Sequence, residues 1–343
     1  MYSFWKGPRE EPAKAKPAPK ARKRTRAPAE GTKESKPQKK KKSRAKADKD
    51  KPTKLGDGIV AFPPAWKPPT ALRNTGPTYF CADEAGRGAL AGYMALGVVA
   101  LPPESDPKVW ACVKDSKAYK DTKRSLARDK RMVARAVIEE HAAAYVVVAA
   151  SVEAIDRLNV TQAGYRGIHF GCEWMLCHGD TSIVEKMAAE GFWVVAGRPF
   201  PVESNARIEG ILMDGKGFKP LIRPNGDLIP YATYTKGDAR VLGIAAASVL
   251  AKSYRDYDMC ALTAEFPELH AYEIGINKGY AAYGADKHGQ VDHRKAIAEH
   301  GFTLSHRLTF DPVKTLYAGG QAARPVGRRG LPPSSSSGGG GAV

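Results

Sequence analysis

The segment CADEAGRGALAG, residues 81–92, places two adjacent carboxylates directly before a glycine-rich turn. Asp83 and Glu84 repel each other unless a cation or a proton relieves them. The turn GRG, residues 86–88, has glycines on both sides of an arginine, which indicates backbone that approaches a ligand closely with a positive charge beside it. The preceding residues, TYFCADEAG, are rich in β-branched and aromatic types and predict a strand that ends at the carboxylates.

Further elements alternate along the chain after this strand. Buried strands are predicted at GYMALGVVALPP, AYVVVAASV and ILMDG, residues 92–103, 144–152 and 211–215, and helices at residues 116–142, 151–177 and 243–266. The second helix has a possible break at Gly164 or Gly167. Residues 182–210 are harder to place and suggest an extra helix and a loop. This order predicts a mixed α/β sheet covered by helices.

The charge of the chain is concentrated at its start. Residues 1–58 hold 20 Lys and Arg against 7 Asp and Glu, so they supply +13 of the net charge of +18. Their Lys, Pro and Ala content has no apolar periodicity, which predicts a disordered basic tail with salt-sensitive attraction to phosphate backbones. We expect a linker at 59–77, a folded domain at 78–318 and a flexible low-complexity tail at 319–343.

Composition excludes some classes of protein. No run of about 18 apolar residues exists, so we expect no membrane partner. Five scattered cysteines argue against a disulfide framework and favour the cytoplasm, or the nucleus if KKKKSRAK is a nuclear address. Cys172, Cys177 and His178 lack a second ligand pair at zinc spacing, which favours thiols that fill the core.

Acidic residues fall at three separate places where chemistry is common in α/β proteins. Asp83 and Glu84 end one strand, Asp214 ends another, and Asp256 lies on the last long helix. Hard oxygen ligands without nearby His or Cys favour Mg²⁺ or Mn²⁺, and two such ions about 4 Å apart can support phosphodiester cleavage. The alternative is that these acids cap helices and turns.

Seven ordered blocks of the chain resemble the ribonuclease HII (type 2 ribonuclease H) family. They are DEAGRGALAG, DSKAYKDTKR, LNVTQAGYRG, LMDG, KGDARVLGIAAASVLAKSYRD, NKGY and HRLTFDPVK, spread over about residues 78–317. The resemblance implies a ribonuclease H-like fold with a central five-stranded mixed sheet and helices on both faces. It also implies an endoribonuclease that uses two divalent ions, Mg²⁺ or Mn²⁺. Such an enzyme cleaves the RNA strand of RNA–DNA hybrids and nicks 5′ of single ribonucleotides in duplex DNA, leaving 3′-hydroxyl and 5′-phosphate ends.

The resemblance also implies the metal ligands. It places the four catalytic, metal-binding acids at Asp83, Glu84, Asp214 and Asp256, with Asp83 bridging the ions. Asp258 is a competitor for the last position but would point to a different face of the helix. Asp238, in KGDA, is the other rival, with a helix cap or a supporting role as its alternative. The AKSYRD context favours Asp256.

Substrate contacts are implied along the same blocks. The residues expected to contact the hybrid or the ribonucleotide-containing duplex are Gly86, Arg87, Gly88, Ser116, Lys117, Lys252 and Tyr280. In the family, the GRG turn follows the backbone at the RNA-to-DNA junction and the tyrosine packs on a sugar. Arg307 is equally compatible with a substrate contact and a structural ion pair. His306 is expected to be structural, since two-metal hydrolysis needs no general base.

The chain departs from the family pattern in two places. AAYGADKHGQVDH follows NKGY in place of Gly-Thr and a nearby histidine, and the stretch before ILMDG is about 20 residues longer, as surface loops tolerate. Two alternatives remain open. Another two-metal nuclease of the same fold would lack the GRG and NKGY blocks, and a non-catalytic hybrid-binding module would lack one of the acids. We expect a monomer, and the sequence identifies no protein partner.

Overall fold

The computed structural model describes residues 78–330 with several gaps. The gaps are 103–105, 107, 115–118, 120–123, 203–207, 223–225, 227 and 273–286. The predicted basic tail and linker, residues 1–77, lie outside the described residues, as do residues 331–343.

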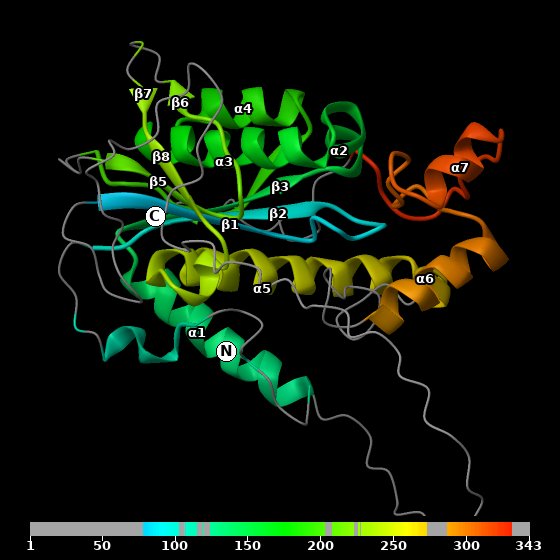
Figure 1. The fold of residues 1–343 in the computed structure, drawn as a ribbon, viewed down its shortest axis with the longest axis horizontal. Helices are drawn as coiled ribbons and strands as arrows, with labels where there is room; N and C mark the ends of the chain where they lie inside the picture. The colour runs from blue at the N-terminus through cyan, green and yellow to red at the C-terminus, as the bar shows by residue number, and fades with distance from the viewer. Residues whose placement is uncertain are drawn as a thin grey trace, which may run out of the picture. The chain divides into compact units, whose positions relative to one another are not determined.

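A mixed six-stranded sheet forms the centre of the described domain (Figure 1). Its strands are β1 (Thr78–Ala85), β2 (Met94–Ala100), β3 (Ala144–Ala150), β4 (Phe192–Arg198), β5 (Ile208–Asp214) and β8 (Tyr231–Tyr234), in the order β4-β3-β2-β1-β5-β8. Neighbours from β4 to β1 are antiparallel, whereas β5 runs parallel to both β1 and β8. A separate pair, β6 (Leu221–Ile222) and β7 (Leu228–Ile229), lies outside this sheet.

The α/β prediction is confirmed, but the sheet has six strands where five were expected. Two of the six, β4 and β8, lie outside the four strands that the sequence located, and β4 falls in the stretch 182–210 that was predicted as a helix and a loop. The helix is present as α4 (Thr181–Ala189), and the rest pairs with β3 because FWVVA, residues 192–196, offers apolar side chains to a sheet.

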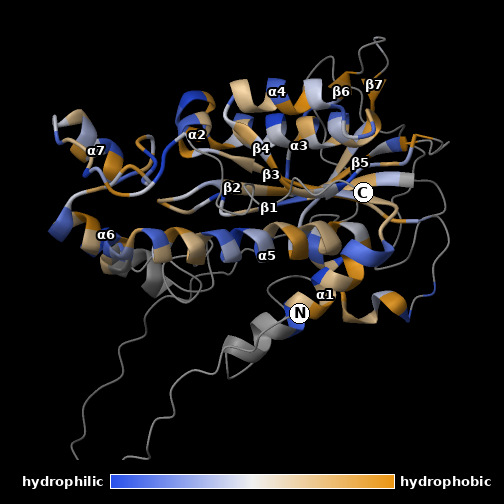
Figure 2. Ribbon diagram, turned by 180° about the vertical axis from the view of Figure 1, so that it is seen from behind, coloured by the Kyte–Doolittle hydropathy of each residue, from blue (hydrophilic) through white to orange (hydrophobic). Residues whose placement is uncertain are grey.

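Helices cover both faces of the sheet (Figures 1 and 2). Helices α2 (Val152–Leu158), α3 (Val160–Leu176) and α4 lie on one face, while α1 (Arg124–His141) and α5 (Leu242–Glu265) lie on the other. The remaining helices are α6 (Lys287–His300) and α7 (Val313–Ala318), with short 3₁₀ turns η1 (Val109–Cys112), η3 (Gly237–Ala239) and η4 (Pro267–Tyr272). Each sheet face therefore has its own apolar core.

The predicted break in the helix at 151–177 lies earlier than Gly164 or Gly167. The chain turns at Asn159, whose φ of 65° is left-handed and whose side chain accepts hydrogen bonds from Thr161 N and Gln162 N. Both glycines lie inside the continuous helix α3. A Cβ on Gly167 would lie 2.1 Å from a methyl of Leu96. Gly167 thus allows close packing, whereas Gly164 leaves room for a Cβ, at 3.6 Å from the Met94 side chain.

Helix α5 also approaches the sheet closely. A Cβ on Gly97 of β2 would lie 2.3 Å from the carbonyl oxygen of Ala247, and one on Gly243 would lie 2.3 Å from the sulfur of Cys81. The helix ends at Glu265, before Pro267, as expected. Two glycines thus set the distance between α5 and the strands that carry the predicted acids.

The described chain continues past 318, where a flexible tail was expected to begin. Arg324 N donates to Phe302 O, Arg328 pairs with Glu265, and Arg329 pairs with Asp156 at 2.6 Å. Residues 319–330 therefore pack on the folded domain.

Candidate active site

Strand alternation separates the two neighbouring acids of β1. Phe80 and Ala82 belong to the core on the α3 face, whereas Tyr79 and Cys81 belong to a cluster with Ile244 of α5. Because side chains of a strand alternate between faces, Asp83 lies on the α5 face and Glu84 on the α3 face. The two adjacent carboxylates are thus directed into different surroundings.

Asp214 joins Asp83 through the register of two parallel strands. Ala82 pairs with Met213, so the next residues, Asp83 and Asp214, end β1 and β5 side by side. Met213 packs in the α3-face core, so Asp214 lies on the α5 face with Asp83.

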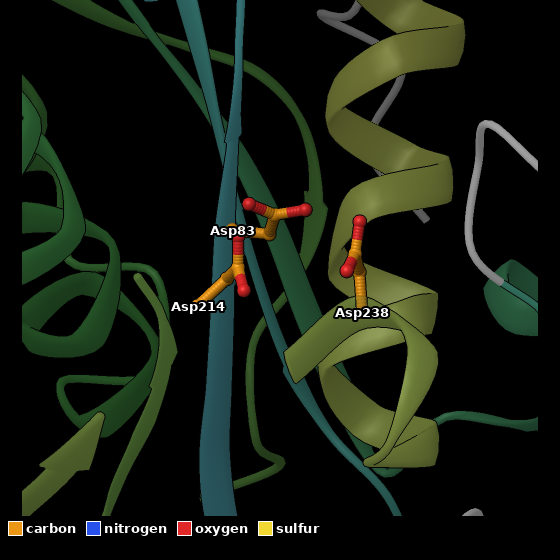
Figure 3. A group of neighbouring side chains, drawn as sticks. All are labelled: Asp83, Asp214 and Asp238. Atoms are coloured by element: carbon orange, nitrogen blue, oxygen red, sulfur yellow. The ribbon is translucent and has the colours of Figure 1, made fainter. Parts of the chain in front are cut away.

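Asp238 completes the acidic group from the turn after β8. Lys236 adopts a left-handed φ of 58°, and the N–H of Gly237 donates to Asp214 Oδ1 at 2.6 Å. This contact brings the 3₁₀ turn η3 against the strand ends. Carboxylate oxygens of Asp83, Asp214 and Asp238 all lie within 4.8 Å of one another (Figure 3). We call these three residues the acidic triad.

The environment of Asp83 opposes its ionisation. Burial raises the pKa of Asp83 well above its ordinary value, and the charges of Glu84 and Asp214 raise it further. Hydrogen bonds from the Ser248 side chain and from the N–H of Glu84, at 2.8 Å to Oδ1, act in the opposite direction. A buried group of repelling carboxylates is the arrangement that a hard cation stabilises.

Glu84 contacts the glycine-rich turn instead of the triad. Arg87 donates from Nη1 to Glu84 Oε1 at 3.1 Å and from Nη2 to Thr161 Oγ1 at 2.8 Å. Gly86 has a φ of 86°, a left-handed conformation that a glycine adopts without strain. The turn is therefore tied both to the acid-bearing strand and to the start of α3.

Asp256 lies outside the acidic triad. Its two carboxylate oxygens accept hydrogen bonds from Lys252 Nζ at 2.6 Å and Arg131 Nη2 at 2.7 Å, and the side chain is 6% exposed. The ammonium of Lys252, expected to contact substrate, is engaged in this pair. Asp258, the rival on the same helix, accepts from the Tyr93 hydroxyl at 2.6 Å. The structure thus brings Asp238, and not Asp256 or Asp258, to Asp83 and Asp214.

The remaining predicted residues divide into two groups. Ser116, Lys117 and Tyr280 lie outside the described residues, together with most of the altered stretch that follows NKGY. His306 is buried as expected, with Nδ1 close to both Thr303 N and Oγ1 and Nε2 at 3.0 Å from His293 Nε2. Burial lowers the pKa of His306 to about 3, so the ring is neutral at pH 7.

Three residues of this region were missed or ranked too low from the sequence pattern. Asp238 was considered a cap or a supporting residue, and its position after KG was the available signal. Ser248, which hydrogen-bonds Asp83, is one of several small residues on α5 and carries no distinguishing pattern. Arg307 donates to the backbone carbonyls of Arg87 and Gly92, so its side chain contacts the glycine-rich turn itself.

Known proteins resemble this chain in sequence. A family model for ribonuclease HII matches residues 81–173. Ribonuclease HII from Bacteroides fragilis is 34% identical over 229 residues, which cover 67% of this chain and 87% of that protein. The chain belongs to the ribonuclease HII family. Ribonuclease HII from Parabacteroides distasonis is 35% identical over 228 residues, 66% of this chain and 87% of the relative.

Membership of the ribonuclease HII family identifies the chain as an endoribonuclease, which is a hydrolase. Its fold is the mixed α/β sheet described above. The crystal structure of ribonuclease H2 from Pyrococcus horikoshii OT3 aligns with a TM-score of 0.41 and 18% identity, covering 71% of this chain and 98% of that one. Among the described residues, no helix is both long and apolar enough to span a bilayer.

Proposed function

We propose that this ribonuclease HII cleaves the RNA strand of RNA–DNA hybrids and nicks duplex DNA on the 5′ side of a single embedded ribonucleotide. The products carry 3′-hydroxyl and 5′-phosphate ends. The observation that carries the proposal is the acidic triad, which lies at the ends of β1 and β5 beside the GRG turn. Family membership supports the reaction class, and the triad supports its chemistry.

The acidic triad fits a divalent cation by the nature of its donors. Its members are oxygen ligands, two of them are buried, and the pKa of Asp83 is raised by burial and neighbouring charge. Mg²⁺ and Mn²⁺ prefer such ligands. We assign Asp83, Asp214 and Asp238 as holding the ions, with Glu84 as a fourth proposed ligand once its carboxylate leaves Arg87. Bound ions would lower the pKa of the attacking water and offset charge on the departing 3′ oxygen.

The chain's own groups then orient the substrate. Gly86 and Gly88 leave room for a nucleic-acid backbone to approach the turn, and Arg87, with 43% of its side chain exposed, supplies a positive charge. Ser248 keeps the Asp83 carboxylate directed toward the α5 face through its hydrogen bond. Ser116, Lys117 and Tyr280 remain proposed substrate contacts, as does Lys252 once its ammonium leaves Asp256.

The test is cleavage of a DNA duplex with one embedded ribonucleotide, in Mg²⁺, Mn²⁺ or EDTA. We expect a metal-dependent nick 5′ of the ribonucleotide, none in EDTA, and a loss of cleavage with retained duplex binding in Asp83→Asn, because phosphate contacts remain. Cleavage in EDTA, or wild-type turnover by Asp83→Asn, would contradict the assignment. Silence of the wild type on both this duplex and a long hybrid, with binding retained, would favour a non-catalytic hybrid-binding module.

A further inference from the structure

Two arginines are the largest side chains that are almost fully buried in the described part of the chain. Arg255 is 1% exposed and Arg307 is 0% exposed. Removing a guanidinium from water costs several kcal/mol unless its donors are satisfied. Neither residue belongs to the acidic triad, so the positions of their donors need an explanation.

Arg307 contacts both ends of the loop that follows β1. Its Nη1 donates to Arg87 O at 2.9 Å, while Nε and Nη2 donate to Gly92 O at 3.1 and 2.9 Å. Its backbone N–H donates to Leu90 O at 2.9 Å. One planar fork therefore spans six residues of backbone, from Arg87 at the centre of the GRG turn to Gly92 before Tyr93.

Arg255 holds the same loop from α5. Its Nε donates to Tyr93 O at 3.0 Å and its Nη2 to Ala91 O at 3.3 Å. The guanidinium also lies against Gly86, where a Cβ would be 1.9 Å from Nε. Gly86 is thus required both by its left-handed φ and by the arginine beneath it. We call residues 86–93 the clamped loop.

These contacts fix the direction of the peptide groups in the clamped loop. The carbonyls of Arg87, Ala91, Gly92 and Tyr93 point toward buried guanidinium groups. In a trans peptide the N–H of the next residue points the opposite way, so the N–H of Gly88 is directed away from Arg307. The two buried positive charges behind the loop add to the attraction that this part of the surface exerts on a phosphate or ribose oxygen.

We propose that Arg255 and Arg307 are positioning residues that hold the clamped loop in the shape that recognises an RNA-to-DNA junction. This rests on the proposed function. Only a planar fork reaches two carbonyls at once, since lysine keeps the charge but offers one compact ammonium. Arg307→Lys should therefore weaken cleavage where a single ribonucleotide must be recognised more than cleavage of a long hybrid, which offers many equivalent registers.

The experiment compares Arg307→Lys and Arg255→Lys with wild type on both substrates in Mn²⁺. We expect kcat/KM on the single-ribonucleotide duplex to fall about 10- to 100-fold, with a clearly smaller loss on the long hybrid. Stabilisation by Mn²⁺ alone, measured as a shift in Tm, should stay unchanged because the acidic triad is intact. A merely structural role would lower both activities together with Tm.

Arg198→Lys is the matched control. Arg198 also donates to two backbone carbonyls, those of Glu140 and Ala142, but it lies on the edge strand β4, which β3 and β2 separate from β1. It should leave the ratio of the two activities unchanged. If Arg307→Lys folds poorly, Arg255→Lys carries the same expectation.

The outcomes separate the two proposals. If the wild-type enzyme does not nick the single-ribonucleotide duplex, the proposed function is overturned, and the positioning role with it. Wild-type enzyme that nicks the junction, beside folded lysine variants that keep the wild-type activity ratio, overturns the positioning role alone.

Discussion

Asp238 and Asp256 are both buried acids, but their carboxylates have different neighbours. Asp238 lies among carboxylates, whereas Asp256 lies between Arg131 and Lys252. Asp238→Asn should lower cleavage by more than about 100-fold, because a proposed metal ligand is lost. In EDTA its Tm should match or exceed that of wild type, since one of three repelling charges is removed.

Asp256→Asn is the matched comparison, measured by the same cleavage assay and by denaturant unfolding. It leaves two partly buried cations without their anion, so the free energy of unfolding should fall by on the order of 3 kcal/mol. Cleavage per folded molecule should remain. Stable but inactive Asp256→Asn beside active Asp238→Asn would restore Asp256 as the metal ligand.

Only some of the acids at the site could be located from the sequence. Asp83 and Asp214 follow apolar strand residues, so their positions at strand ends were predictable from the local pattern. Asp238 reaches them only through the left-handed turn at Lys236 and the hydrogen bond from Gly237 to Asp214. That contact joins residues 23 apart in the chain and leaves no periodic signal. The local sequence around Asp256, AKSYRD on a clear helix, favoured it over Asp238 as a metal ligand. In the structure its carboxylate instead pairs with Arg131 and Lys252.

At the scale of elements, the close approach of α5 to β2 holds the helix next to β1, the strand that carries Asp83. Gly97 pairs with Asp83, and its Cα faces the backbone of Ala247, next to Ser248. In Gly97→Ala the new methyl would meet a backbone oxygen that cannot rotate away, so α5 must move from the sheet. We expect the free energy of unfolding to fall by about 1–3 kcal/mol, with slower cleavage as Ser248 moves from Asp83.

Gly164→Ala in α3 provides the control for that substitution. Its new Cβ would lie 3.6 Å from the Met94 side chain, an ordinary contact, and alanine favours a helix over glycine by up to about 1 kcal/mol. Thermal and denaturant unfolding should therefore show Gly164→Ala as stable as wild type or more so. Equal stability of the two alanine variants would refute the packing argument.

Element prediction from the sequence succeeded where periodicity and length were clear. The strands at β1, β2, β3 and β5 and the helix α5 followed from continuous apolar runs and from Pro267 as a stop. Strand β8 has only four residues, YATY, which is too short a run to identify alone. Strand β4 has seven residues, but it directly follows helix α4 and a glycine, so its apolar run FWVVA was assigned to a loop. Both are defined by pairing with β5 and β3, a tertiary contact.

At the scale of the whole molecule, charge is divided unevenly between the tail and the folded domain. Residues 1–58 carry +13 and the remaining 285 residues only +5. The acids and the clamped loop that we assign to chemistry and junction recognition all lie in the folded domain. We therefore expect the tail to act through its charge, by adding attraction to the phosphate backbone of the substrate.

Deleting residues 1–58 should separate affinity from specificity. At low salt we expect weaker duplex binding and a smaller slope of log K against log salt, because fewer counterions are released. Near 1 M salt, where the Debye length is about 3 Å, the truncated and full chains should bind alike. Binding titrations over a salt series, with cleavage products mapped on the same duplex, measure both effects. The nick should stay 5′ of the ribonucleotide at every salt concentration, and a shifted nick would show that the tail contributes to recognition.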